Sequence, residues 1–486
     1  MFRIAAAVAL VCLPVAAHAQ TAWNPDPWVE DLETIRTALH EKYANREWLE
    51  QERGVPIDPI LDLVESMVRR AGSDAEARAT FDLLIRKIDD GHVSLRWPRP
   101  EAPASASATA EAPAPPTSAT QFCQAQGYSA RGGGGTAKLL PGYTPLAAEG
   151  LFPAGIVPIG EARVGVLRIG EFSPEAFPAL CEGIVRDLAI PIDQPCAEDC
   201  RDVLITEAYR RLTFAWMERI EQLHDAGATH LLIDETGNGG GSEWAEAAAR
   251  ALTPRQLVSA RFGFVRGPHW EKQWRDLAQT LRSAAEESND PSEQARLREW
   301  AAQAEAARVE AATPCDPTDD CEWLGRAGYA TGLVGSAPDG AFADVDWGAS
   351  VFSAGQYAYP YRSGVWNGPL IVLVDQETWS AAEQFAALLQ DNDAAIILGA
   401  RTGGAGCGHT WGGTPTTLPN SGAVLELPDC VRFRRDGSNE VRGILPDVTI
   451  PWRADDGTVL KRQILAAALP DALRRAAALY RDQTAP

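Results

Sequence analysis

The 486-residue sequence has no long run of lysine or arginine, and its formal net charge at pH 7 is −22. Binding to nucleic acids or to anionic membranes requires a basic face that neutralises phosphates. The charge balance therefore argues against both kinds of partner. The rest of the composition, 45% hydrophobic and 23% charged, is ordinary for a globular protein and leaves room for two or three domains.

The sequence also lacks a long apolar stretch of the roughly 20 residues that a membrane span requires. A shorter one, from Ile4 to Ala17, follows Arg3 and ends in the small-x-small pattern Ala17-His18-Ala19. We therefore expect residues 1–19 to be a signal peptide, with an uncleaved anchor as the alternative. The mature protein is expected to be exported, periplasmic or secreted, without a membrane span.

CxxC pairs and Cys/His clusters are missing too, which removes the usual ligands of a structural metal ion. We predict no metal and no cofactor. An even number of cysteines remains after signal removal, and in an exported chain this predicts disulfides. The close pairs Cys196/Cys200 and Cys315/Cys321 suggest local bridges, which would leave Cys407 with Cys430 and Cys123 with Cys181. Eight cysteines allow 105 pairings, so other connectivities stay open.

Apolar periodicity predicts helices first and an α/β pattern later. Trp28, Leu32, Ile35 and Leu39 recur at helical spacing, whereas strands such as 163–169 and 230–234 alternate with helices such as 208–225 and 242–252. Such alternation favours a mostly parallel, covered sheet. The expected segments are 20–97 (helical amino-terminal domain), 98–121 (Pro/Ala/Ser-rich linker), 122–254 (first part of the core), 255–350 (helical insertion) and 351–486 (second part of the core).

The insertion contains a charged stretch, Trp270 to Ala312, whose pattern predicts a helical hairpin. No residue type in it suggests chemistry, which favours a solvated decoration. A lid or a substrate-selecting arm is the alternative interpretation.

The apolar run Leu370 to Val374 predicts a strand that ends in a short polar turn, with Ser380 at the start of the next helix. A helix start directs backbone N–H groups and the positive end of the helix dipole at whatever reacts with this hydroxyl. Ser380 is therefore a candidate nucleophile. A serine at this position is also a common helix N-cap, which is the alternative.

Three further segments carry residue types that acyl transfer through serine requires. The glycines after strand 230–234 let backbone amides approach a ligand, so Gly239 or Gly240 and Ala381 are candidate oxyanion-hole donors. His92 is a candidate general base, and Glu440 is a candidate to orient it. The structural alternatives are a tight turn, a strand-edge histidine and a surface acid.

The order of these segments resembles the tail-specific, or carboxyl-terminal processing, serine protease family. The resemblance covers about 160–255 and 365–452. It rests on Val164-Gly-Val-Leu-Arg-Ile169, Leu232-Ile-Asp-Glu-Thr-Gly-Asn-Gly-Gly-Gly241, Thr378-Trp-Ser-Ala-Ala-Glu383 with its continuation to Gly403, and Gly443-Ile-Leu-Pro-Asp-Val448. It implies an α/β fold with a β-β-α spiral (ClpP/crotonase-like) protease core.

The sequence departs from the family in informative ways. The processing proteases use a Ser/Lys dyad, but Ala405 stands at the lysine position and no lysine lies between Ser380 and Asn439. The tricorn-like branch instead uses serine, histidine and glutamate, which Ser380, His92 and Glu440 match. His409 lies near the same turn and is a rival base.

Two other family features are altered. Thr236 replaces the usual arginine after the oxyanion strand, and the interval 96–160, where the family often has a PDZ domain, is largely linker.

The sequence therefore predicts an exported serine peptidase that hydrolyses peptide or protein substrates through an acyl-enzyme on Ser380. A non-catalytic peptide-binding member of the same fold is the first alternative, motivated by the missing lysine and the altered glycine turn. A small-ester hydrolase is the second. The sequence carries no indication of an oligomeric state.

Overall fold

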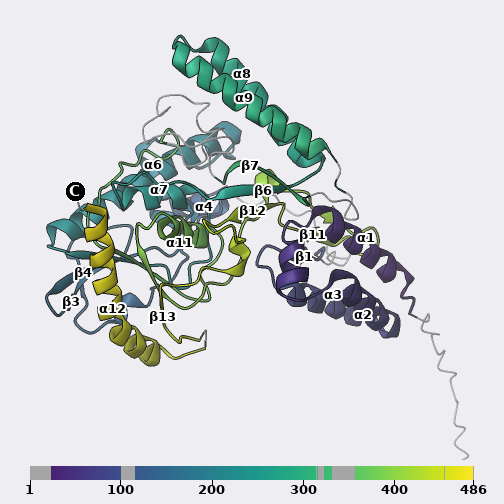
Figure 1. The fold of residues 1–486 in the computed structure, drawn as a ribbon, viewed down its shortest axis with the longest axis horizontal. Coiled ribbons are helices and arrows are strands. Elements are labelled where there is room, and N and C mark those ends of the chain that lie inside the picture. The colour runs from purple at the N-terminus through teal and green to yellow at the C-terminus, as the bar shows by residue number, and fades with distance from the viewer. Residues whose placement is uncertain are drawn as a thin grey trace, which may run out of the picture.

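The computed structural model describes residues 23–99, 115–313, 315, 322–330, 356–453 and 455–484. The expected signal peptide, most of the expected linker and the end of the expected insertion lie outside these residues. Among the helices that the structure describes, none combines the length and apolar character needed to cross a bilayer. Figure 1 shows a central α/β body, an amino-terminal group of helices beside it, and a helical hairpin at the top of the view.

The amino-terminal region is helical, as the periodicity predicts. Its helices are α1 (Asp26–Lys42), α2 (Ile57–Arg70) and α3 (Asp74–Ile88), with a π-helical turn at Trp48–Glu52. Ser73 caps α3 by accepting a hydrogen bond from the N–H of Glu76. The short strand β1 (Ser94–Arg96) follows and pairs antiparallel with β11 (Val424–Glu426), which pairs in turn with β10 (Thr416–Thr417).

This pairing joins the two ends of the chain in one apolar core. Leu418, Leu425 and Val441 are buried in the same cluster as the apolar faces of α1, α2 and α3. The residue that follows these helices, His92, is thereby fixed against a segment more than 300 positions later in the sequence.

The central sheet has seven strands in the order β13-β9-β8-β5-β4-β3-β2. The five strands from β13 to β4 are parallel, and β3 and β2 are antiparallel to their neighbours. This confirms the expected mostly parallel sheet. The strands are β2 (Thr144–Pro145), β3 (Ala154–Ile159), β4 (Ala162–Arg168), β5 (His230–Asp234), β8 (Leu370–Val374), β9 (Ile396–Gly399) and β13 (Val448–Thr449).

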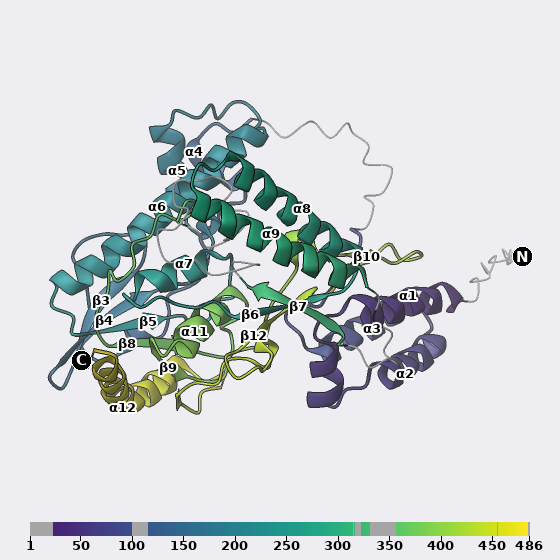
Figure 2. The same ribbon diagram turned by 45° about the horizontal axis from the view of Figure 1, so that its top comes forward.

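Helices cover both faces of this sheet (Figure 2). On β8, Leu370, Val372 and Val374 share a core with helices α6 (Glu198–Asp225), α7 (Trp244–Ala251) and α11 (Ala381–Asp391). The alternate residues Ile371 and Leu373 face α12 (Thr458–Thr484). Since both faces are buried, β8 is a continuous apolar run rather than an alternating one.

The predicted helical hairpin consists of α8 (Pro268–Glu287) and α9 (Pro291–Ala312). At its base, β6 (Arg261–Val265) lies between β7 (Leu324–Tyr329) and β12 (Cys430–Phe433) in a three-stranded antiparallel sheet. The insertion is thus connected directly to β12, a strand that contributes to the candidate active site.

Three of the expected disulfides are present, Cys123–Cys181, Cys196–Cys200 and Cys407–Cys430. The first joins α4 (Ala119–Ala125) to α5 (Pro178–Asp187). The fourth expected pair includes Cys321, which lies outside the described residues.

Candidate active site

Ser380 lies in a strained turn between β8 and α11. Its backbone has φ 54° and ψ −116°, a conformation that side-chain-bearing residues rarely adopt and that clusters at functional sites. The turn is held to the glycine loop after β5, because the N–H of Trp379 donates to the Asn238 carbonyl over 2.9 Å and the N–H of Gly237 donates to Asp375 Oδ1 over 2.9 Å. The predicted strand, turn and helix are therefore observed, with a conformation that a simple N-cap does not require.

His92 faces this hydroxyl. Its Nε2 lies 3.1 Å from Ser380 Oγ, and its Nδ1 lies 2.7 Å from the carbonyl oxygen of Ala405. A carbonyl only accepts hydrogen bonds, so Nδ1 carries the proton and Nε2 presents its lone pair to the serine. Burial lowers the pKa of His92 to about 4, which keeps the imidazole neutral at neutral pH.

A buried carboxyl group holds the backbone of His92. Asp90 Oδ1 accepts the N–H of His92 over 3.0 Å, while Oδ2 accepts Tyr43 Oη–H and the Asn45 side-chain amide. Burial raises the pKa of Asp90 to about 6. Asp90 was not predicted as a site residue, although an aspartate side chain often accepts the N–H two residues further on in an Asx turn.

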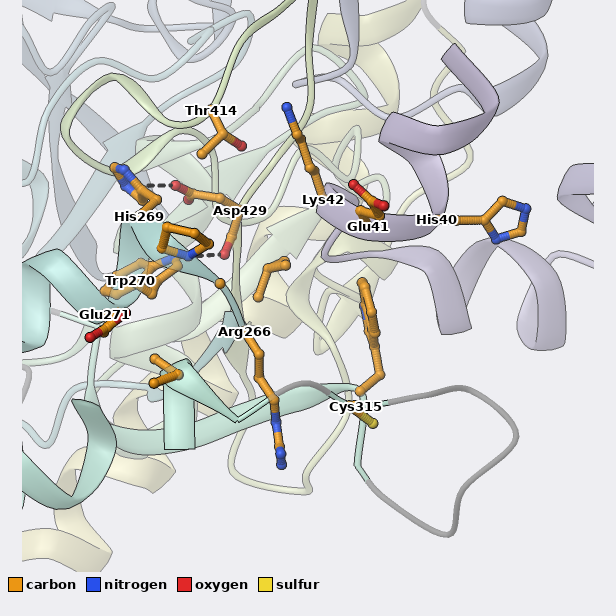
Figure 3. A pocket seen from close by; sticks show the side chains of 16 residues that line it. His40, Glu41, Lys42, Arg266, His269, Trp270, Glu271, Cys315, Thr414 and Asp429 are labelled. Carbon is orange, nitrogen blue, oxygen red and sulfur yellow. Dashed lines mark hydrogen bonds and ion pairs between the residues drawn. The ribbon is translucent and has the colours of Figure 1, made fainter. Parts of the chain in front are cut away.

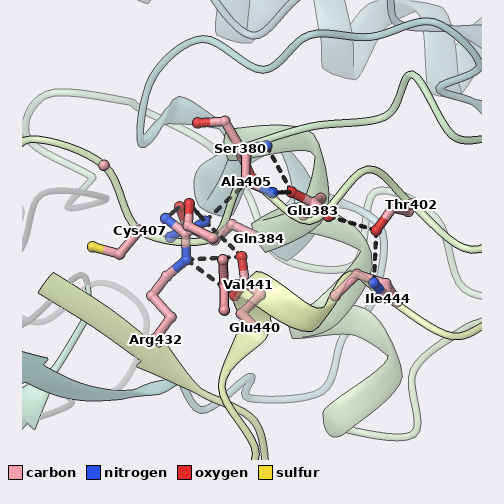
Figure 4. A network of polar contacts seen from close by, with 12 residues as sticks. Ser380, Glu383, Gln384, Thr402, Ala405, Cys407, Arg432, Glu440, Val441 and Ile444 are labelled. Atoms are coloured by element: carbon pink, nitrogen blue, oxygen red, sulfur yellow. Dashed lines mark hydrogen bonds and ion pairs between the residues drawn. The ribbon is translucent and has the colours of Figure 1, made fainter. Parts of the chain in front are cut away.

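Glu383 connects the serine turn to the loop that orients His92 (Figure 4). Its Oε2 accepts the N–H groups of Ser380 at 3.0 Å and Ala405 at 2.7 Å. Its Oε1 accepts Thr402 Oγ1–H at 2.5 Å and the N–H of Gly404 at 2.8 Å. Burial raises the pKa of this carboxyl to about 7. The Ser-x-x-Glu spacing of a capping box is the sequence signal that could have identified it.

Glu440 is buried and forms an ion pair with Arg432 of β12. Arg432 Nε donates to both carboxylate oxygens at 3.0 Å. The Nη2 of the same guanidinium donates to the carbonyl oxygens of Ser380 at 3.2 Å and Gly406 at 2.8 Å. The structure thus brings Glu440 to the site but places it against Arg432, while the Nδ1–H of His92 donates to the Ala405 carbonyl. The negative charge of Glu440 raises the pKa of His92 through space, in opposition to burial.

Arg432 was not predicted. It lies in β12 between the apolar residues Val431 and Phe433, and no local pattern indicates which group would pair with it. Figure 4 shows its guanidinium below Ser380 and beside Glu440 and Gln384, to both of which it donates. A charged residue in the middle of a buried strand is the only sequence signal for it.

The candidate oxyanion-hole donors lie around Ser380, but they are not equivalent. The N–H of Gly240 already donates to Asn238 Oδ1 at 2.9 Å. A Cβ atom at Gly240 would lie 2.8 Å from Ser380 Cβ, so glycine is required there for close approach. Among the contacts of the described residues, the N–H groups of Gly239 and Ala381 donate to no other protein atom.

An arginine on a neighbouring strand supports the glycine turn, although Thr236 replaces the usual arginine within the turn itself. Thr236 donates from both its N–H and its hydroxyl to Asp234 Oδ1. Arg168, on the neighbouring strand β4, donates to the Asp234 carbonyl at 2.9 Å. The turn is therefore supported from an adjacent strand.

His409, the rival base, stacks edge-on against His92 with 5.9 Å between the ring centroids. Ser380 Oγ–H donates its hydrogen bond to His92 Nε2 and not to His409. The structure therefore brings Ser380 together with the histidine that lies 288 residues before it.

A cavity of about 560 Å³ is lined by the end of α1, the start of α8 and Asp429 (Figure 3). Trp270 and Trp323 form apolar parts of its wall. His269 Nε2 lies 3.3 Å from Asp429 Oδ2 there, and this carboxylate raises the pKa of His269. Asp429 Oδ1 also accepts the N–H of Thr410, the residue after His409, at 3.1 Å.

Comparisons with known proteins agree with this fold. Residues 209–450 match the model of Peptidase family S41, and the chain belongs to this family of peptidases. This confirms the expected relation to tail-specific serine proteases. Mature CPAF is a similar solved structure, with a TM-score of 0.59, 17% identity, and coverage of 95% of this chain and 98% of that chain.

Mature CPAF complexed with lactacystin is similar as well, with a TM-score of 0.58, 16% identity, and coverage of 94% and 99%. At such identities the likeness shows a shared fold. An uncharacterised protein of Chlamydia muridarum is 32% identical over 101 residues, and a protein of Chlamydia trachomatis serovar D is 31% identical over 101 residues. Each alignment covers 20% of this chain but only 16% of the relative.

Proposed function

We propose that this protein is a serine peptidase that hydrolyses peptide bonds through an acyl-enzyme on Ser380. The observation that carries the proposal is the 3.1 Å contact between Ser380 Oγ and His92 Nε2, in the tautomer that accepts a proton. Ser380 Oγ attacks the scissile carbonyl carbon while its proton passes to His92 Nε2. The N–H groups of Gly239 and Ala381 stabilise the negative charge on the carbonyl oxygen.

The second half of the reaction uses the same groups. His92 gives its proton to the leaving amine as the carbon–nitrogen bond breaks, which leaves an ester on Ser380. Water then attacks this ester, loses a proton to His92, and releases the acid and the free serine.

Glu440 acts, in this proposal, through Arg432. The ion pair holds the guanidinium where it fixes the carbonyl groups of Ser380 and Gly406, one in the nucleophile turn and one beside Ala405. The site therefore works as a Ser–His–Glu arrangement in which Ala405 orients the imidazole and Glu440 is a positioning residue.

Peptides or proteins are the proposed substrates, as the family membership suggests. Three disulfides among the described residues fit an oxidising compartment, in keeping with export. The acidic sequence argues against a nucleic-acid partner.

A fluorophosphonate probe tests the nucleophile. We expect stoichiometric labelling of the wild-type protein at Ser380, located by peptide mass spectrometry, and none in Ser380→Ala. His92→Ala should slow labelling and peptide cleavage by about 10²–10⁴-fold, whereas His409→Ala should keep most of the wild-type rate.

Each contrary result points to a different revision. Labelling that persists in Ser380→Ala would remove the serine from the mechanism, and a larger loss in His409→Ala than in His92→Ala would transfer the base to His409. A wild-type protein that binds unfolded peptides but never reacts is a non-catalytic peptide binder. Ester turnover without peptide cleavage identifies a small-ester hydrolase.

A further inference from the structure

Trp379, immediately before the proposed nucleophile, presents a large aromatic side chain to solvent. It is 41% exposed, although aromatic rings of this size usually contribute to cores. The ring is held in place, because its Nε1–H donates to the Gln376 carbonyl at 2.8 Å. Its backbone N–H donates to Asn238. The exposed indole is therefore a fixed surface next to Ser380.

Gly403 allows the indole to lie where it does, and Gly91 lies beside the ring. A Cβ atom at Gly403 would lie 1.8 Å from Trp379 Nε1, so the ring rests directly on the backbone at that position. A Cβ atom at Gly91 would lie 3.5 Å from Trp379 Cε3. Gly91 precedes His92, and Gly403 lies two residues before Ala405, whose carbonyl binds His92. The indole thus adjoins both segments that hold the imidazole.

The position of the imidazole determines which part of a substrate would meet this ring. His92 must give its proton to the leaving amine, so the residue that carries this amine lies on the imidazole side of Ser380. An exposed indole offers an apolar, polarisable face that binds aliphatic and aromatic side chains better than small or anionic ones.

We propose that Trp379 is a specificity-determining residue that binds the first residue on the leaving-group side of the scissile bond and selects an apolar or aromatic side chain there. This inference rests on the proposed peptidase function, because it assigns a substrate class to the same site. The indole contributes binding only, and the acyl transfer proceeds on Ser380 and His92 as described.

Internally quenched peptides that vary one position on either side of the scissile bond test the selection. We expect the wild-type protein to prefer Phe or Leu over Gly and Asp on the leaving-group side. Trp379→Ala should reduce that preference by about tenfold in kcat/KM, and Trp379→Phe should retain most of it. Phe214→Ala is the matched control, since Phe214 is 43% exposed on α6 and should leave the preference unchanged.

Two independent measurements sharpen this test. The acyl-enzyme can be intercepted with amino-acid amides, and partition toward Phe-amide over Gly-amide should fall in Trp379→Ala, because the amide occupies the leaving-group position. Gly403→Ala should shift the same selectivity by displacing the indole while Trp379 itself is unchanged.

The outcomes separate the two proposals. If the Trp379→Ala variant still reacts with the fluorophosphonate but keeps the wild-type selectivity, the role of Trp379 is overturned and the peptidase function stands. A preference that lies on the acyl side of the bond and disappears in Trp379→Ala also overturns the role of Trp379. Failure of the wild-type protein to react with the probe overturns the peptidase function and this inference with it.

Discussion

At Glu383, four donors meet two carboxylate oxygens, so every lone pair of the ionised group is used. Protonation would remove one acceptor position and release the Ser380 turn or the loop that carries Ala405. Burial nevertheless raises the pKa of Glu383 to about 7, while that of His92 falls to about 4. We therefore expect the acid limb of kcat/KM to lie near pH 7 and to report Glu383.

A pH profile of kcat/KM with a quenched peptide checks this assignment. Glu383→Gln should lower activity at every pH, because its amide nitrogen cannot accept, and it should lose the inflection near pH 7. An acid limb near pH 4 in the wild-type protein would instead report the titration of His92 and contradict the role given to Glu383.

The same carboxyl should make stability and activity vary oppositely with pH. The folded protein binds the Glu383 proton more tightly than the unfolded chain, since the pKa rises from 4.5 to about 7. Its contribution to the free energy of unfolding is full below about pH 4.5 and is lost as the pH rises through about 7. The difference in urea stability between wild type and Glu383→Gln, measured across pH 4–8, should follow this course; a difference that grows toward pH 8 has the wrong sign.

The Arg432–Glu440 pair predicts a loss of stability in addition to a loss of activity. Glu440→Ala leaves a buried guanidinium without its main partner, which should lower the free energy of unfolding by about 3–5 kcal/mol. Arg474→Ala, which breaks an exposed pair with Asp471, should cost less than about 1 kcal/mol. Urea denaturation measures both. A Glu440→Ala protein of wild-type stability but low activity would indicate that Glu440 acts on His92 directly.

At the scale of elements, the loop from Ala405 to Thr410 and strand β12 hold the two halves of the site together. The Cys407–Cys430 disulfide links two segments of the site. Cys407 follows Ala405, which contacts His92, and Cys430 precedes Arg432, which contacts Ser380. It closes a loop with a sequence separation of 23, for which chain entropy predicts a stabilisation of about 3 kcal/mol.

Replacing both cysteines of this pair with serine should therefore lower the urea midpoint and also reduce kcat, because the Ala405 carbonyl loses an anchor. The matched control removes Cys196–Cys200, whose sequence separation is only 4 and which joins the α5–α6 connection to the first turn of α6. That double variant should keep the wild-type kcat. Equal kcat losses in the two variants would show that the effect is not specific to the Ala405 loop.

At the scale of the whole molecule, the amino-terminal helices are held to the core by packing and strand pairing rather than by chain connection alone. They share a buried cluster with Leu418, Leu425 and Val441, and β1 pairs with β11. We predict that a chain cut at a protease site inserted between residues 100 and 114 remains one complex. The two pieces should co-elute in size-exclusion chromatography and keep fluorophosphonate labelling, whereas pieces that separate would contradict the prediction.

The elements of the fold could largely be predicted, because each depends on local patterns. The continuous apolar run at β8 and the helical spacing of Trp28, Leu32 and Ile35 require no distant information. The base of the insertion could not be predicted, since β6 pairs with β12 across more than 160 residues. Long-range pairing depends on which surfaces remain to be covered after the local elements have formed.

The sequence by itself determined the serine turn and the glycine turn, because strand, turn and cap propensities act between near neighbours. Only the tertiary structure decided how these parts meet. It placed His92 Nε2 beside Ser380 Oγ, directed the Nδ1–H of His92 to the Ala405 carbonyl, and paired Glu440 with Arg432. Buried charges pair with whatever group the folded core brings within reach, and no local pattern specifies that group.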